Sequence, residues 1–153
     1  MKNTNLKDAA LTAHFSLGEM CASGTARQLG IENIPDEQTI IRLRHLCEHV
    51  LEPLRRRFGA IRITSGYRCG QLNKAVGGAA RSQHLWGEAA DIHVSNREVG
   101  MKMFRFIQEN LLFDQLLFEH VMDDGACWLH VSYRAVEARN RRMANAAYKV
   151  PHK

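Results

Sequence analysis

The sequence predicts an α+β fold, with a small antiparallel sheet and flanking helices. Three observations carry this prediction. Apolar residues three or four apart over residues 37–58 predict one long amphipathic helix. Alternating side chains over Ala89–Val94 predict a strand. Two further apolar runs, residues 113–122 and 126–133, are separated by Asp123-Asp124-Gly125, and an Asp-Gly pair in that position predicts a hairpin.

Shorter elements follow from local signals. Residues 16–19 and 95–98 have the capping-box pattern. The first predicts a short helix, and the second predicts a helix that runs to about Asn110. Pro53 is expected to kink the long helix or split off its last turn, because proline has no backbone N–H. Residues 60–64 predict a short strand and residues 72–76 a helical turn. The tail from Arg134 is expected to be a helix or a loose end.

The composition is that of one globular domain. The chain has 153 residues, of which 45% are hydrophobic and 24% charged. We expect a single domain over residues 1–153, with an N-terminal extension (1–13) and a basic C-terminal segment (134–153). No apolar leader or membrane-length apolar run is present, so we expect cytoplasmic synthesis without a signal peptide and no integral membrane segment. The four cysteines form no CxxC pair and are expected to be reduced thiols.

The net charge of +5 is unevenly distributed. Residues 134–153 hold six basic residues and one acidic residue, whereas residues 1–133 hold fifteen of each. No recognition motif accompanies this charge, so we expect no nucleic-acid partner. The basic segment is expected either to hold the protein near an anionic wall or membrane, or to be a solvated tail or terminal helix.

Two stretches could bind zinc. The first, residues 45–49, is a literal H-x-x-E-H, a pattern that places two imidazoles one helical turn apart. On a regular helix, however, His45 and His49 lie opposite the apolar stripe. We therefore expect both to face solvent rather than the dry cleft that a catalytic zinc needs.

The second stretch combines His84 and Asp91 with the later His130. Two imidazoles and one carboxylate leave one tetrahedral position free, which is typical of a catalytic rather than a structural zinc. The spacing alone is also compatible with a turn histidine and a strand aspartate. His93 shares a strand face with Asp91, so it is a rival ligand that we rank below His130.

The hairpin adds a further candidate. A two-residue turn at residues 124–125 would pair Phe118 with Val131 on the apolar face, and Glu119 with His130 on the other face. Directly opposed residues have Cβ atoms roughly 4.5–5.5 Å apart. Glu119 would then be a general base or a carboxylate that orients His130. The alternative is an exposed strand glutamate, and a three-residue loop would break this register.

Several motifs resemble one family. They are residues 63–68 (ITSGYR), 72–73, 76–78, 82–84 (SQH), 87–91 (GEAAD) and 128–132 (WLHVS), with weaker similarity at 15–20 and 51–55. Together they resemble the zinc D-Ala-D-Ala carboxypeptidases and related bacterial and phage peptidoglycan peptidases, which share their fold with the hedgehog signalling domain. The resemblance spans roughly residues 14–142 and is strongest to the small phage-type branch.

The resemblance implies a site that holds one Zn²⁺. Its ligands would be His84, Asp91 and His130, and Arg68 would hold or polarise the substrate. The other expected substrate-binding residues are Ser82, Gln83 and Trp128. Several relatives have a catalytic Glu or His two or three residues before the last ligand, where this chain has Trp128 and Cys127. We therefore expect Glu119 to serve as the catalytic base.

These expectations define a function. The chain would be a zinc peptidase that cleaves a peptide bond in peptidoglycan stem peptides, as a carboxypeptidase or as an endolysin-type endopeptidase. We expect it to act on the cell wall as a monomer and to be the product of a phage or prophage. The alternative is a non-catalytic zinc-containing phage structural or wall-binding module of the same fold.

Overall fold

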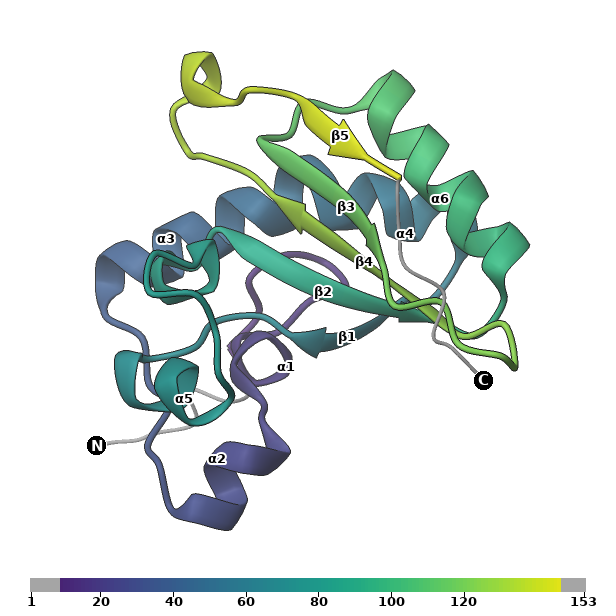
Figure 1. Cartoon of the computed structure of the whole chain (residues 1–153). Coiled ribbons are helices and arrows are strands. Elements are labelled where there is room, and N and C mark those ends of the chain that lie inside the picture. Colours follow the sequence, from purple (N-terminus) through teal and green to yellow (C-terminus); the bar gives the residue numbers. More distant parts are fainter. Residues whose placement is uncertain (1–8, 147–153) are drawn as a thin grey trace.

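The computed structural model describes residues 9–146 and contains one five-stranded sheet with the order β1-β2-β4-β3-β5 (Figure 1). The strands are β1 (Arg62–Ser65), β2 (Ala89–Val94), β3 (Gln115–Glu119), β4 (Cys127–Ser132) and β5 (Met143–Asn145). The first four pair antiparallel, whereas β5 pairs parallel with β3. The α+β prediction is confirmed, although the sheet is mixed rather than purely antiparallel.

Most of the helices begin at side-chain caps. The helices are α1 (Leu17–Cys21), α2 (Gly24–Leu29), α3 (Glu37–Leu46), the π-helix η2 (Cys47–Leu51), α4 (Glu52–Phe58), α5 (Gly70–Ala75), the 3-10 turns η3 (Gln83–Trp86) and η4 (Glu137–Arg139), and α6 (Arg97–Asn110). Among them, η2, α4 and η4 have no side-chain cap. The Ser16 hydroxyl accepts from the backbone N–H of Glu19, as the capping box predicts. The second predicted cap is one residue off, because Asn96 rather than Ser95 accepts from the N–H of Val99.

The long predicted helix is divided into three pieces, and Pro53 explains the division. Proline has no N–H to donate to the carbonyl of His49, four residues earlier. The chain widens just before it, where the N–H of Glu52 donates to the carbonyl of Cys47, five residues back. The expected interruption at Pro53 is therefore observed as a division of the helix by a π-turn at Cys47–Leu51.

The two faces of the sheet differ sharply in polarity. Ile92, Leu129 and Phe118 are aligned across β2, β4 and β3 and are buried. Helices α3, α4 and α6 pack on this face (Figure 1). The opposite face carries Asp91 and His130. No helix among residues 9–146 has the length and apolar composition needed to cross a bilayer.

The loop between β3 and β4 is one residue longer than predicted. The N–H of Met122 donates to the carbonyl of Ala126 at 2.7 Å, and the N–H of Gly125 donates back to the carbonyl of Met122 at 3.0 Å. Gly125 has a φ of 93°, a conformation that glycine adopts without strain. The connection is therefore a three-residue loop at residues 123–125 rather than a two-residue turn.

A second irregularity shifts the register further. His120 has a φ of 50°, and the chain gains one unpaired residue between the loop and β3. As a result Glu119 pairs with Trp128, and His130 pairs with Leu117. The predicted pairing of Glu119 with His130 is wrong, although both side chains remain on the same face of the sheet.

The C-terminal segment is part of the fold up to residue 146. It forms η4 and β5, so the expectation of a loose tail or a terminal helix is wrong for these residues. The Arg142 guanidinium lies 5.6 Å from the Phe113 ring and donates to the carbonyl of Gln108. Lys149 and Lys153 lie outside the described residues.

Candidate metal centre

His84 is held in one orientation by its own turn and by a neighbouring loop. It lies in η3, where the Ser82 hydroxyl accepts from the His84 N–H at 3.2 Å. Its side chain is only 3% exposed. The Nδ1 atom lies 2.6 Å from the carbonyl oxygen of Gly66. A carbonyl can only accept, so Nδ1 carries a proton. Nε2 faces the Asp91 carboxylate, to which it donates when the ring is protonated, and in the neutral imidazole its lone pair is available to a metal.

The position of that carbonyl is fixed by close packing. A Cβ atom at Gly66 would lie 2.3 Å from the carbonyl oxygen of Met20, so only glycine fits there. The same Met20 oxygen accepts from the N–H of Tyr67 at 2.7 Å. The next residue, Arg68, donates its N–H to the carbonyl of His84 at 3.0 Å. The SGYR motif therefore serves as the support on which His84 is oriented.

Asp91 and His130 are brought together by the sheet. They are directly paired on β2 and β4 and point to the face opposite the core. His130 Nδ1 lies 2.9 Å from Asp91 Oδ1, and His84 Nε2 lies 3.3 Å from Asp91 Oδ2. One ligand atom from each of the three residues can be chosen so that all lie within 4.8 Å of one another.

The electrostatics of the cluster favour a charged carboxylate. Burial raises the pKa of Asp91, but hydrogen bonds from His130 and His84 more than offset this, and the pKa lies well below its usual range. A carboxylate between two imidazoles is a donor set that suits Zn²⁺. The Nδ1–H of His84, bonded to a backbone carbonyl, is the outer hydrogen bond that zinc-bound histidines typically make.

The other His/Glu motif forms no comparable group. Among residues 9–146, His84, Asp91 and His130 form the only cluster of three potential ligands. His49 is exposed and stacks on Tyr133 with ring centroids 4.7 Å apart. His45 is half-buried rather than solvent-facing, with its Nδ1 atom enclosed. The predicted exposure is therefore confirmed for His49 and wrong for His45.

A groove of about 390 Å³ opens beside the cluster. It is lined by Thr64, Asp91, Glu119, His120, Met122 and Trp128. Glu119 is thus in the groove, although it stands diagonal to His130 and not opposite it. Cys127 lies three residues before His130, on the buried core face, and its side chain is fully buried. It cannot reach this groove.

Arg68 lies on the other side of the cluster. Its Nη2 donates to the Ser82 hydroxyl at 3.4 Å, and its Nε is buried without a partner. Burial lowers the pKa of Arg68, and the nearby Asp91 carboxylate offsets part of that change. Ser82 therefore connects Arg68 to the turn that carries His84. Substrate binding by Arg68 stays a prediction.

Comparison with protein families supports the resemblance that the motifs indicate. Residues 13–132 match the family model described as Peptidase M15. The chain belongs to this family. The family assignment suggested by the motifs is confirmed, and with it the description of the chain as a peptidase. No match is found among curated proteins.

Gln83 of this M15 peptidase makes a hydrogen bond within the protein. Its side-chain amide donates to the carboxylate of Asp114 at 3.1 Å. Asp114 is fully buried and is also bound by Arg134 and bidentately by Arg141. Substrate binding by Gln83 therefore stays a prediction, and the contact indicates a structural role. The Asp114 cluster was not predicted, because its members are far apart in the sequence and match no motif.

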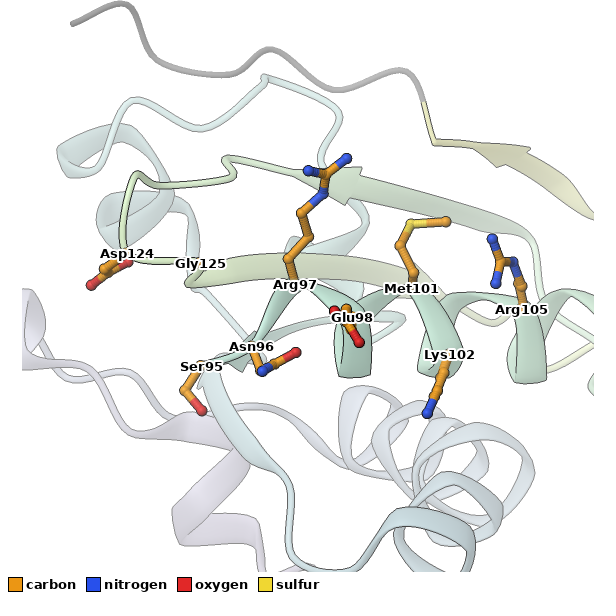
Figure 2. A pocket seen from close by; sticks show the side chains of 9 residues that line it. All are labelled: Ser95, Asn96, Arg97, Glu98, Met101, Lys102, Arg105, Asp124 and Gly125. Atoms are coloured by element: carbon orange, nitrogen blue, oxygen red, sulfur yellow. The ribbon is translucent and has the colours of Figure 1, made fainter.

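A second cavity of the M15 peptidase lies away from the cluster. It has a volume of about 550 Å³ and lies along the first half of α6, beside the β3–β4 loop (Figure 2). Arg97 and Arg105 lie on one side of the helix in this view, and Glu98 and Lys102 on the other. The lining mixes basic and acidic side chains and includes no histidine or cysteine, so the cavity does not resemble a zinc site.

Proposed function

We propose that this M15 peptidase is a zinc enzyme that hydrolyses a peptide bond in peptidoglycan stem peptides. The observation that carries the proposal is the compact cluster of His84, Asp91 and His130 beside a groove that Asp91 helps to line. The family match and the resemblance of the motifs to peptidoglycan peptidases supply the substrate class. The cell wall would be its place of action and a phage or prophage its source, and we expect one zinc ion and a monomer.

The roles of the residues follow from their positions. The metal would be held by Nε2 of His84, by Nδ1 of His130 and by the carboxylate of Asp91. When bound, zinc supplies a Lewis acid that polarises the scissile carbonyl and activates water. Arg68 would bind a substrate carboxylate or the oxygen on which negative charge develops. Ser82 orients both Arg68 and the His84 turn.

Glu119 is the proposed general base. Its position diagonal to His130 corresponds to a Cβ separation of roughly 7–8 Å, so an extended glutamate side chain could reach a water near the cluster. It would accept the proton of the attacking water and pass it to the leaving amine. Trp128, paired with Glu119 across the strands, would form the floor under the substrate.

The test is hydrolysis of purified muropeptides, followed by mass spectrometry. We expect cleavage by the zinc-loaded protein, loss with a chelator and recovery with zinc. Glu119→Gln should keep the zinc and lose about 10²–10⁴-fold in turnover. The masses of the products separate carboxypeptidase from endopeptidase activity.

The matched control is the double variant His45→Ala, His49→Ala, which removes the other histidine pair and should keep both zinc and activity. Full activity of His84→Ala would refute the proposal. One bound zinc without hydrolysis of any muropeptide would instead favour the non-catalytic wall-binding module, for which the lack of a Glu or His at positions 127 and 128 is the supporting observation.

A further inference from the structure

His120 has a backbone conformation that changes where its side chain points. Its φ of 50° lies in the left-handed region, which is uncommon for residues other than glycine. Successive side chains in a strand point to opposite faces. Glu119 and His120 nevertheless both line the groove. The left-handed residue thus turns the imidazole to the same side as the glutamate.

The imidazole also helps to fix the Trp128 ring. The centroid of the His120 ring lies 6.5 Å from that of Trp128, and the two planes are inclined at 80°. His93 approaches the same indole at 4.9 Å and 71°. Trp128 is therefore contacted by two imidazoles in edge-to-face geometry. Such contacts hold an aromatic ring in a defined orientation.

Arg68 and His120 flank the metal centre on opposite sides. Ser65 pairs with Asp91, and the chain then continues to Arg68, which bonds the carbonyl of His84 in the turn before β2. Trp128, which His120 contacts, pairs with His93, two residues beyond Asp91 toward the end of β2. A substrate crossing the cluster would therefore have one end near Arg68 and the other near His120.

From this placement we propose that His120 is a substrate-binding residue that donates a hydrogen bond to a peptide carbonyl oxygen of the substrate segment lying over Trp128. The inference rests on the proposed function and deepens it. If Arg68 binds the C-terminal carboxylate of a stem peptide, the segment at His120 is on the N-terminal side of the scissile bond. The groove then selects for length on that side.

The test uses two variants that suit the left-handed conformation. His120→Gly removes the imidazole without backbone strain, and His120→Asn keeps a shorter amide donor in a residue that tolerates this region. One hydrogen bond corresponds to about a three- to tenfold loss. We expect His120→Gly of the zinc-loaded enzyme to lose that factor in kcat/KM, mostly through KM, and His120→Asn to lose less.

The substrates are designed to locate the contact. A soluble stem peptide is compared with one shortened at its N-terminal side and with one amidated at its C-terminus. Shortening should remove most of the difference between wild type and His120→Gly, because both then lack the contact. Amidation should affect wild type and His120→Gly equally. A difference that survives shortening, or that disappears on amidation instead, overturns the proposal.

Controls separate this inference from the proposed function. His49→Ala removes an exposed histidine outside the groove and should leave kcat/KM unchanged. Zinc content and thermal unfolding should match between wild type and His120→Gly, so that a loss of affinity is not a loss of fold. If the wild type cleaves no stem peptide, the proposed function fails. Calorimetric binding of the long peptide to zinc-loaded wild type and His120→Gly then decides about His120, since equal affinities overturn the contact.

Discussion

Asp91, in β2, and Asp114, directly before β3, are two carboxylates with different partners. Both have a pKa held well below the usual range against the effect of burial. The partners of Asp91 are two imidazoles, which can be neutral and can bind a metal. The partners of Asp114 are the guanidiniums of Arg134 and Arg141, which stay protonated. The identity of the partners, rather than the depth of burial, separates a candidate reaction centre from a structural ion cluster.

The two clusters also differ in what they connect. Asp91 joins two strands and the His84 turn around a groove open to solvent. Asp114 joins the start of β3 to the segment after β4. It also accepts a hydrogen bond from Gln83, the residue next to His84. The structural cluster therefore supports the turn on which the candidate ligand is carried.

Replacing the Asp91 carboxylate by an amide should give the largest effect on zinc content and activity. Asp91→Asn keeps the shape but removes the anionic ligand, so we expect loss of zinc and a fall in muropeptide hydrolysis on the order of a thousandfold or more. Metal analysis and product analysis of the same preparation check this. Near-normal zinc content in Asp91→Asn would contradict the assignment of Asp91 as a ligand.

The same exchange in Asp114 should affect stability instead. Removing one partner of a buried ion pair leaves the others uncompensated, and half-exposed arginines recover part of the cost in water. We expect Asp114→Asn to lower the free energy of unfolding by about 3 kcal/mol, measured by urea denaturation. Turnover per zinc-loaded, folded molecule should stay within about twofold.

Zinc should distinguish the two clusters in a third way. A ligand at a hundred times its Kd stabilises the folded state by about 2.7 kcal/mol. We expect added zinc to stabilise the folded state of wild type and of Asp114→Asn by this amount, and not to stabilise Asp91→Asn. Thermal unfolding with and without added zinc measures it, with unfolding in chelator as the baseline. An equal gain in all three proteins would place the metal elsewhere.

Acid should weaken the Asp114 cluster. Its pKa in the folded state lies below the unfolded value of 3.8, so the stability it contributes is complete above about pH 5 and is lost as the pH falls toward the folded value. We expect the difference in unfolding free energy between wild type and Asp114→Asn to shrink between pH 5 and pH 2. A difference that is constant with pH would mean that the cluster is not held by charge.

Gln83→Ala should have the smallest effect and tests two roles at once. Loss of its hydrogen bond to Asp114 should cost about 1 kcal/mol of stability. If Gln83 also contacts substrate, KM will rise by several fold; if its role is structural, KM will stay near the wild-type value. Urea denaturation and steady-state kinetics on the same variant separate these outcomes.

The sequence predicted the parts of this molecule that are carried by local signals. The amphipathic helix, the hairpin and the set His84, Asp91 and His130 all follow from spacing or from motif resemblance. The pairing of Glu119 failed because register depends on the number of loop residues and on one left-handed residue, His120. Neither is visible in the alternation of side chains, which is the same for registers that differ by two residues.

Two further features had no local signal. Strand β5 is three residues long and its sequence, Met-Ala-Asn, has no polar–apolar alternation. The Asp114 cluster is assembled from distant segments, because Arg141 is 27 residues after Asp114 and Gln83 is 31 residues before it. An aspartate that follows three apolar residues, Leu111–Phe113, was the one available hint of a buried partner.

The short outer strands have a consequence for self-association. Exposed strand edges are templates on which other chains can add, and β3 would be such an edge without its neighbour. Strand β5 covers it with only three residues, and the other border strand, β1, has four residues and a register irregularity at Thr64. A chain that ended after Tyr133 would lose both the cover and the arginines that neutralise Asp114. Residues 134–146 thus replace the exposed edge of β3 by the shorter edge of β5, which offers less backbone for edge-to-edge aggregation.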